Sequence, residues 1–572
     1  MLRLRFGFVS IAMVVSVFGA RLVQLQALDP HAYAAAAAQE GLVEAVLPAR
    51  RGTILDRNGQ PLAASVDGLM VVADPQMTRD QAPEIAKFLA NRLDIDYFDT
   101  REALSREDTR FAYIARRVPA TLADEVVDEA TELGYQGLAT RPDQVRDYPA
   151  HDVGANLVGY MGGVGQPLGG LELTFDKQLA GHDGSERYEV GGGNRIPLGE
   201  NVTVEPQNGT NLRTTIDRDL QWYVQKVLAQ TVEGANADSG MAVVMDTRTG
   251  ELLADADYPT YDADDALESP EEDRGAPSLS SPYEPGSVEK ALTMAALIDQ
   301  GKASPTQRMS VPPEVTVMGE TIHDYFVHPR LRLTLTGVLA KSSNIGTVLA
   351  SRRIGPGVLK RYLEAFGLGT KTGIGVRGES SGLMPEGTWN PLSRATIAFG
   401  QGISVNAVQM AAAINTIANG GVYVAPSLIQ GSATTDGDDV VGTDSATTHR
   451  VVSEKAAHDV ARMMERVLDP DEGVAPLAAI DGYRVAGKTG TAQVVDSACG
   501  CYQAGVYNVS FAGFAPADDP RFTVYVVIRH PRNGGGGGST AGPAFQKIMS
   551  RALARYRVPP TGTAPSKLPI LW

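Results

Sequence analysis

Residues 283–298 read YEPGSVEKALTMAALI and contain the only Ser-x-x-Lys sequence in the 572-residue chain, from Ser287 to Lys290. Pro285 and Gly286 interrupt the preceding segment, and Ala, Leu and Met then recur with helical spacing, so we predict a helix that begins near Ser287. Because residues three apart lie on the same face of a helix, we expect the Lys290 amine beside the Ser287 hydroxyl. A serine with an adjacent base is the minimal form of an activated nucleophile.

Two further motifs decide how this pair is interpreted, because a helix cap followed by a surface lysine would give the same pattern. Residues 342–344 read SSN, a Ser-x-Asn sequence, and residues 488–490 read KTG. Ser-x-x-Lys, Ser-Asp-Asn and Lys-Thr-Gly together are typical of penicillin-binding proteins and class A β-lactamases, and here Ser343 stands at the centre of the second motif. The three motifs together predict a catalytic serine.

Each of the two later motifs occurs twice. Residues 371–373 also read KTG, but they lie in a glycine-punctuated stretch that is typical of a loop. Residues 488–490 lie in a strand-like run, whose edge could hold an extended peptide by backbone pairing. Residues 404–406 read SVN directly before an alanine-rich helical stretch, where a helix cap explains them. We therefore prefer residues 342–344 and 488–490.

The residue types suggest roles in acyl transfer. The Ser287 Oγ atom would attack a carbonyl carbon, and Lys290 must be neutral to accept the proton. Burial and the nearby charge of Lys488 would both lower the pKa of Lys290. Ser342 could relay a proton toward the leaving amine, and Asn344 could hold Lys290 and the substrate amide.

The third motif suits the binding of a substrate that ends in a carboxylate. Lys488 and Thr489 supply a cation and a hydroxyl, and the backbone N–H groups of Ser287 and Thr491 are the expected oxyanion donors. We therefore assign substrate binding and oxyanion stabilisation to Ser343, Lys488, Thr489, Gly490 and Thr491. None of the eight histidines is needed, and no spacing of His, Cys and acidic residues predicts a metal site or a cofactor.

Further segments extend the pattern: RGTILDRNG at 51–59, RDYP at 146–149, GLE at 170–172, TID at 215–217 with LQ at 220–221, and FGQG at 399–402. With these segments the chain resembles the class B penicillin-binding proteins, and most of all the division-specific transpeptidases of the FtsI type. The resemblance implies an α+β fold. Its catalytic domain would be of the penicillin-binding transpeptidase and serine β-lactamase type, an antiparallel sheet flanked by helices on an elongated α+β pedestal.

The resemblance also implies an activity. Ser287 would attack the D-Ala-D-Ala bond of a peptidoglycan stem peptide, release the last D-Ala and pass the acyl group to an amine on a neighbouring strand. β-Lactams would acylate the same serine. The implied partners are a polytopic SEDS glycan polymerase of the FtsW type and the divisome proteins.

Other functions stay open at this point. An elongation-specific transpeptidase would carry the same motifs. A D,D-carboxypeptidase or β-lactamase would use water as the acceptor, and residues 386–390 (EGTWN) are the one Glu-x-x-x-Asn sequence after Ser342 that could position it. A catalytically silent scaffold would usually show a damaged motif, whereas all three are intact here.

The N-terminus indicates localisation. Arg3 and Arg5 precede 15 uncharged residues at 6–20, fewer than the roughly 20 of a comfortable membrane span. Because the long Arg21 side chain can reach the membrane–water interface, an anchoring helix could continue to residue 28. We favour an uncleaved signal anchor over a cleaved signal peptide. This predicts a single pass through the cytoplasmic membrane, with the N-terminus inside and the catalytic domain outside.

The charge of the chain limits its possible partners. The net charge of −16, with no long basic run, argues against nucleic acid as a partner.

The length and the sequence pattern predict several domains. We predict a cytoplasmic stub and anchor at 1–28, a helical stalk at 29–44, a non-catalytic pedestal or dimerisation module at 45–212, a transpeptidase domain at 213–558 and a flexible tail at 559–572. Within the catalytic domain we expect a hairpin at 241–254, a helix at 452–467 capped by Ser453, a buried strand at 522–528 and a closing helix at 543–556.

Two features near the third motif have no predicted role. Cys499 and Cys501 are the only cysteines, and reduced thiols, an internal disulfide or an intermolecular link are all compatible with their spacing. Residues 534–538 are five consecutive glycines, which predict a flexible loop.

Overall fold

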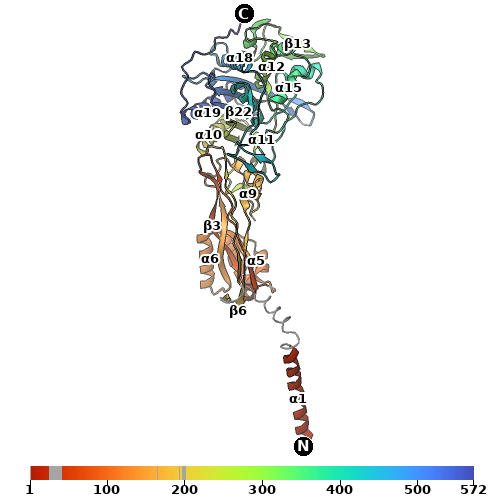
Figure 1. Ribbon diagram of the computed structural model, residues 1–572, viewed down its shortest axis with the longest axis vertical. Coiled ribbons are helices and arrows are strands. Elements are labelled where there is room, and N and C mark those ends of the chain that lie inside the picture. Colours follow the sequence, from red (N-terminus) through yellow and green to blue (C-terminus); the bar gives the residue numbers. More distant parts are fainter. Residues whose placement is uncertain are drawn as a thin grey trace. The chain divides into compact units, whose positions relative to one another are not determined.

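The computed structural model describes residues 2–24, 42–107, 109–163, 165–191, 194–195, 201–496 and 498–572 (Figure 1). The chain forms two compact units. The first unit comprises Met1–Arg51, Ser65–Val145 and Ala180–Gly209, and the second comprises Gly52–Ala64, Arg146–Leu179 and Thr210–Trp572. The predicted stalk at 29–44 lies outside the described residues except at 42–44, which belong to a strand rather than a helix.

The first unit combines strands with a small helical layer. Its helices and strands are α1 (Leu2–Val23), β1 (Leu42–Leu47), β3 (Pro61–Ala73), α3 (Pro75–Thr78), α4 (Ala82–Leu93), α5 (Tyr97–Leu104), β4 (Ala112–Pro119), α6 (Ala120–Glu132), β5 (Leu138–Asp147), β6 (Gly184–Gly191), β7 (Asn194–Arg195) and β8 (Val202–Val204). Strand β3, whose first residues belong to the second unit, pairs with β4 and β5, while β1 and β8 pair with β6. The helices of this unit pack on its core through buried apolar side chains, among them Ile85, Leu89 and Val126. Within the part of the chain that the structure describes, no helix is long and apolar enough to cross a membrane.

The second unit is built on a five-stranded antiparallel sheet in the order β11-β10-β22-β21-β20. The strands are β10 (Ser239–Asp246), β11 (Leu252–Tyr258), β20 (Ala486–Asp496), β21 (Cys501–Ala515) and β22 (Phe522–Arg529). The β10–β11 hairpin and the buried strand β22 confirm two predictions from the sequence. Because all but the last residue of β22 are buried, both faces of the sheet are covered.

Alternate residues of β22 show which helices cover which face. Phe522 packs its ring on Tyr556, directly after α19 (Ala541–Arg555), whereas Thr523 donates a hydrogen bond to Asn415 of α17 (Ala407–Ala418). Since neighbouring residues of a strand point to opposite faces, α19 and α17 lie on opposite sides of the sheet. Helix α10 (Arg218–Gly234) contacts α19, and α18 (Glu454–Glu465) contacts α17.

Two predicted helices of this unit are confirmed. Ser453 caps α18 by accepting from the Ala456 N–H group, and α19 begins two residues before the predicted closing helix. The remaining elements are β2 (Ile54–Leu55), α7 (Ala155–Val158), α8 (Gly170–Thr174), α9 (Asp176–Ala180), β9 (Leu212–Arg213), α11 (Pro277–Ser280), α12 (Lys290–Asp299), β12 (Arg308–Val311), β13 (Glu314–Val317), β14 (Glu320–His323), β15 (Leu331–Thr334), α13 (Leu335–Ala340), α14 (Asn344–Ser351), α15 (Val358–Ala365), α16 (Pro391–Ile397), β16 (Val422–Val424), β17 (Ala433–Thr434), β18 (Val440–Val441) and β19 (Thr448–Arg450).

Candidate active site

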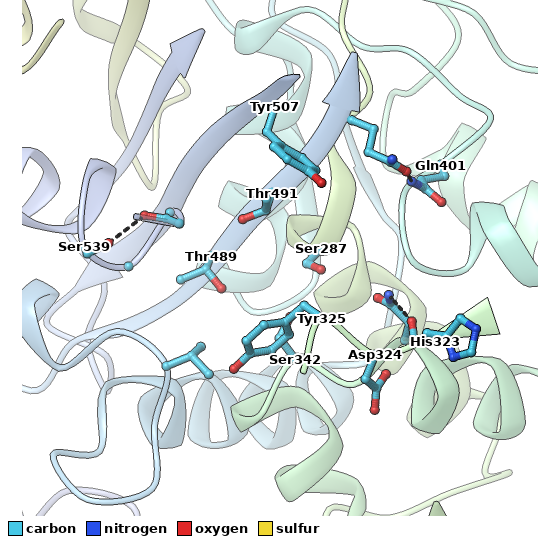
Figure 2. Close-up of a pocket in the computed structure, with 16 residues that line it drawn as sticks. Ser287, His323, Asp324, Tyr325, Ser342, Gln401, Thr489, Thr491, Tyr507 and Ser539 are labelled. Carbon is cyan, nitrogen blue, oxygen red and sulfur yellow. Dashed lines mark hydrogen bonds between the residues drawn. The ribbon is translucent and has the colours of Figure 1, made fainter. Parts of the chain in front are cut away.

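Ser287 lies at the entrance to helix α12, in a 3-10 turn at Gly286–Val288. The α-helix therefore begins three residues later than the sequence predicts. The side chain of Ser287 is half-buried and lines a cleft of about 630 Å³, together with Ser342, Asn344, Thr489 and Thr491. Figure 2 shows Ser287 between the β20 side chains and the Ser342 segment. Among the described residues the Ser287 hydroxyl makes no hydrogen bond, so it is free to turn toward a substrate carbonyl.

Three glycines let the segments around Ser287 approach one another. A Cβ atom on Gly400 would lie 2.0 Å from the Gly286 carbonyl oxygen, and the Gly286 N–H group donates to the Gly400 carbonyl at 3.0 Å. A Cβ atom on Gly490 would lie 3.1 Å from the Pro285 carbonyl oxygen and 2.1 Å from Ser510 Oγ. The glycine of the Lys-Thr-Gly motif is thus required for packing, because any side chain would push β20 away from the Ser287 turn.

Lys290, Ser342 and Lys488 form one hydrogen-bonded chain below the cleft. Lys488 Nζ lies 2.9 Å from Ser342 Oγ, and Lys290 Nζ lies 3.3 Å from the same oxygen. Lys290 Nζ also donates to Asn344 Oδ1 at 2.7 Å and to the Ser342 carbonyl oxygen at 2.6 Å. The fold therefore brings residues from all three motifs into direct contact.

Burial controls the protonation of both lysines. The side chains of Lys290 and Lys488 have no exposed surface. Burial lowers the pKa of Lys290 to about 7, against the opposing effect of the Asp324 and Glu289 carboxyls. Burial, followed by the charge of Lys290, lowers the pKa of Lys488 well below its usual range. A neutral Lys290 can accept the Ser287 proton near neutral pH.

Glu289, between the two motif residues, points away from this chain. It is fully buried, and Thr293 Oγ1 lies 2.9 Å from its Oε1 atom. Burial raises the pKa of Glu289 well above its ordinary value. The neutral acid can donate to Thr293, which in turn donates to the Ala398 carbonyl oxygen at 3.0 Å. The raised pKa limits the negative charge that Glu289 places beside Lys290.

The Ser342 backbone is held in an unusual conformation. Its φ of 56° lies in the left-handed region, which residues other than glycine seldom adopt. This conformation follows the end of α13 and places Ser342 Oγ between the two lysine amines. Strained backbone of this kind is typical of functional sites that the surrounding structure holds in place.

Ser343 differs from its predicted role in substrate binding. Its side chain is fully buried and caps α14, where Ser343 Oγ accepts from the Gly346 N–H group at 2.9 Å. The same hydroxyl donates to Asp324 Oδ2 at 2.7 Å. Ser343 faces the protein interior because the residues on either side of it, Ser342 and Asn344, take the positions next to Lys290.

The wall formed by β20 carries the third motif. Lys488 Nζ contacts Thr489 Oγ1 at 3.1 Å, while Thr491 is exposed toward the cleft. The glycine run at 534–538 forms a loop, as predicted, and Gly536 to Gly538 line the cleft beside this wall. A Cβ atom on Gly537 would lie 2.2 Å from the Ser510 carbonyl oxygen. These glycines allow the loop to lie directly against β20 and β21.

Several cleft residues were not found from the sequence. Tyr325 and Tyr507 line the cleft, as does Gln401, whose side chain donates to Gln493 on β20 at 3.2 Å. Gln401 lies in the FGQG segment, which gave a signal for the family but not for a position in the cleft. Tyr325 and Tyr507 lie in segments without a motif, so only the fold could place them.

The alternative motifs lie elsewhere in the second unit. Residues 371–373 form a loop in which Thr372 donates to Glu379, and Asn406 caps α17, as the sequence predicts. Asn390, the last residue of the Glu-x-x-x-Asn sequence, caps α16, and Glu386 is exposed. Among the described residues that line the cleft, neither is present.

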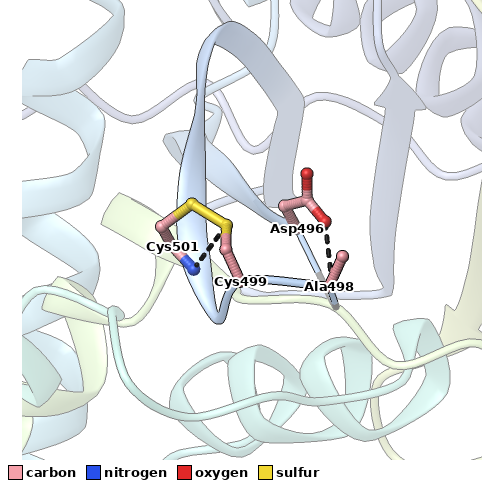
Figure 3. Close-up of a disulfide and its surroundings, with 4 residues drawn as sticks. All are labelled: Asp496, Ala498, Cys499 and Cys501. Carbon is pink, nitrogen blue, oxygen red and sulfur yellow. Dashed lines mark hydrogen bonds between the residues drawn. A yellow bond between two sulfur atoms is a disulfide. The ribbon is translucent and has the colours of Figure 1, made fainter.

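Cys499 and Cys501 form a disulfide at the turn that joins β20 to β21 (Figure 3). The turn is also supported by the Asp496 carboxylate, which accepts from the Ala498 N–H group at 2.8 Å. The next residue, Tyr502, donates its hydroxyl to Glu284 at 3.1 Å. This contact links the hairpin tip to the segment that precedes Ser287.

Among the residues that the structure describes, one group of possible metal ligands emerges only from the fold. His151, Asp262 and Asp264 have ligand atoms within 4.8 Å of one another. His151 is exposed, its Nδ1 atom lies 3.3 Å from both carboxylates, and none of the three residues lines the cleft. Contacts between side chains at the surface account for this group.

Models of known protein families match the chain over both of the regions that the motifs occupy. Residues 240–550 match the penicillin-binding protein transpeptidase domain, and residues 46–214 match the penicillin-binding protein dimerisation domain. The chain belongs to the penicillin-binding proteins.

Similar proteins cover nearly the whole of this penicillin-binding protein. Penicillin-binding protein PbpB of Mycolicibacterium smegmatis is 36% identical over 97% of this chain and 91% of its own length. Peptidoglycan D,D-transpeptidase FtsI of Escherichia coli is 33% identical over 94% of this chain and 89% of its own length. The crystal structure of penicillin-binding protein 3 from Mycobacterium tuberculosis, complexed with aztreonam, has a TM-score of 0.72 at 31% identity and covers 92% of this chain and 100% of its own.

Proposed function

We propose that this penicillin-binding protein is a serine-type peptidoglycan D,D-transpeptidase that acts in septal wall synthesis, and that β-lactams acylate its serine. The observation that carries the proposal is the chain from Lys290 through Ser342 to Lys488 beside Ser287. Relatives named FtsI and PbpB support the division role, and a related structure with bound aztreonam supports β-lactam binding.

The first step forms an acyl-enzyme. Ser287 Oγ attacks the carbonyl carbon of the D-Ala-D-Ala bond, and neutral Lys290 accepts its proton. The backbone N–H groups of Ser287 and Thr491 would stabilise the oxyanion. When the C–N bond breaks, the departing amine of D-Ala needs a proton, which Lys290 returns through the Ser342 hydroxyl, 3.3 Å from its Nζ atom.

The second step transfers the acyl group. An amine from a neighbouring stem peptide attacks the ester carbonyl, and its proton returns by the same route to Ser287 Oγ as the ester bond breaks. Lys488 and Thr489 suit the terminal carboxylate of the donor peptide, as Thr489 lines the cleft and Lys488 Nζ lies 3.1 Å from its hydroxyl. The exposed edge of β20 could pair with the peptide backbone.

A hydrolase is less well supported. A β-lactamase of class A needs a glutamate near the serine to activate water, and the one candidate sequence, at 386–390, has its asparagine at a helix cap and its glutamate exposed. An amine acceptor therefore fits the cleft better than a glutamate-activated water.

We also propose that residues 1–28 anchor the protein in the cytoplasmic membrane, with the catalytic unit outside. The large apolar side chains of α1 from Phe8 to Val23 are exposed, and a continuous apolar surface of this kind needs a cover. A SEDS glycan polymerase and divisome proteins are the proposed partners, reached through residues 45–212. Alkaline extraction of membranes tests the anchor, because a peripheral protein would be released.

Labelling with fluorescent penicillin tests the function. The wild-type protein should form a covalent adduct, and Ser287→Ala should form none, because the acyl group has no other activated oxygen to bind. Ser280→Ala is a suitable control, since Ser280 lies on the surface and outside the cleft. An adduct on another residue of the Ser287→Ala variant would contradict the assignment.

A further inference from the structure

A buried carboxylate lies behind the Ser-x-Asn motif. Asp324 follows the last residue of β14, and its side chain has no exposed surface. Asp324 Oδ2 accepts from Ser343 Oγ at 2.7 Å, and Asp324 Oδ1 accepts from the Ile345 N–H group at 3.0 Å. Asp324 therefore binds the two residues that alternate with Ser342 and Asn344 along the chain.

Donors occupy both oxygens of the Asp324 carboxyl. Ser343 Oγ already accepts from the Gly346 N–H group at 2.9 Å, so the serine proton is available for Asp324. The Ile345 N–H group can only donate. With donors on both oxygens, the Asp324 carboxyl has no acceptor toward which to direct a proton of its own among these partners.

His328 makes the third contact to Asp324. Its Nε2 atom lies 3.0 Å from Asp324 Oδ2, and its Nδ1 atom lies 2.6 Å from the Pro329 carbonyl oxygen. Each ring nitrogen therefore faces an oxygen, and a ring that carries protons on both nitrogens would satisfy both contacts. The His328 side chain is 3% exposed, and its ring lies 5.0 Å from the Phe326 ring, measured between ring centroids. His328 and Asp324 thus form a buried hydrogen-bonded pair.

We propose that His328, as an imidazolium, is a positioning residue that holds the Ser342 and Asn344 side chains against Lys290. The effect passes through Asp324, which binds Ser343 and Ile345. This proposal rests on the proposed transpeptidase function, because it assigns His328 a part in the acylation of Ser287. Asp324 holds Ser343, the residue that directly follows the left-handed Ser342.

As an imidazolium, His328 also balances the charge around Lys290. The charged and titratable groups that influence Lys290 and its partner Lys488 are Asp324 and Glu289, and Asp324 raises the pKa of Lys290 against the effect of burial. The cation on His328 opposes that effect. Removal of the cation should therefore raise the pKa of Lys290, and removal of the Asp324 charge should lower it.

Acylation by fluorescent penicillin, measured against pH on the full-length protein, tests this. His328→Gln should lower the second-order acylation rate roughly ten- to a hundredfold, because Ser342 and Asn344 lose their fixed positions. Its pH midpoint should move upward by about one unit, since Asp324 is no longer balanced. Asp324→Asn should also slow acylation but move the midpoint downward. His458→Gln, which removes an exposed histidine on α18, is the matched control and should match the wild type.

Opposite shifts of the two midpoints would support the proposal. A slower rate with unchanged midpoints, or a His328→Gln rate equal to that of the control, would overturn it. If His328→Gln does not fold, the nitrogen chemical shifts of the His328 ring in the wild-type protein at pH 7 decide: a singly protonated ring contradicts the proposal. Failure of wild-type labelling at Ser287 would instead contradict the transpeptidase function, and the ring measurement would still stand.

Discussion

Two buried pairs of like-charged side chains lie in the second unit, and each is bridged by one serine hydroxyl. Ser342 Oγ lies between Lys290 and Lys488, at 3.3 and 2.9 Å. Ser278 Oγ lies between Asp255 and Asp257, at 3.1 and 3.0 Å from their carboxylate oxygens. All four charged side chains are buried.

The two pairs differ in their proton count. A hydroxyl donates once and accepts twice, so both lysine amines can donate to Ser342 Oγ, whereas Ser278 Oγ can donate to only one of its two carboxyl partners. The other carboxyl of the acidic pair therefore holds a proton of its own. Burial raises the pKa of Asp255 to about 7, and burial followed by the Asp255 charge raises that of Asp257 well above its ordinary value.

Access to the cleft separates the two pairs. Ser342 lines the cleft with Ser287, so a proton moved along the lysine pair can reach a substrate. Ser278, a residue of α11, is fully buried, and among the described residues of the cleft none belongs to the acidic pair. The same arrangement thus serves proton transfer at one place and affects only stability at the other.

The largest effect is expected when one lysine of the basic pair is removed. Lys488→Ala should lower the acylation rate for carboxylate-bearing penicillins about 10²–10³-fold, because the carboxylate and Ser342 both lose a partner. Thermal unfolding should show an intact fold. Lys371→Ala, in the second Lys-Thr-Gly sequence, is the matched control and should leave acylation unchanged. The reverse result would mean that residues 371–373 are the functional motif.

The pH dependence of acylation sharpens the comparison. Lys290 accepts a proton only when neutral, and its pKa is lowered to about 7. The acylation rate should therefore rise with pH through about 7 and fall about tenfold for each unit below it. Stopped-flow measurements between pH 5 and 9 would test this, and a rate that falls as pH rises through 7 would exclude Lys290 as the base.

A smaller effect is expected at the acidic pair. The folded-state pKa values of Asp255 and Asp257 lie above the unfolded value of 3.8, so the folded protein binds more protons and wild-type stability falls as pH rises through about 7. Asp257→Asn removes the repulsion while its side chain can still accept from the Ser278 N–H group, now 2.7 Å from Asp257 Oδ1. The variant should gain roughly 1–3 kcal/mol at pH 8 relative to the wild type.

Thermal unfolding at pH 5 and pH 8 measures this gain, and acylation serves as the second readout. The advantage of Asp257→Asn should be larger at pH 8 than at pH 5, and its acylation rate should equal that of the wild type. A loss of acylation would show that the acidic pair is coupled to the cleft, and the comparison drawn above would fail.

Local patterns account for the elements that the sequence predicted well. The β10–β11 hairpin and helix α18 follow from short-range spacing and from the Ser453 cap. The disulfide was one of three options, because a one-residue spacing does not determine the oxidation state. Ser343 was misplaced because the motif names three adjacent residues, whereas the left-handed turn at Ser342 and the start of α14 at Asn344 direct the middle residue into the interior.

The amino-acid sequence by itself determined the three motifs, their order and the family, since these depend only on residue identity along the chain. Only the tertiary structure decided that Lys290 and Lys488 share one hydroxyl and that His328 stands behind Asp324. The reason is physical: proton affinities depend on burial and on neighbours within a few ångströms, and packing brings those neighbours together from distant parts of the chain.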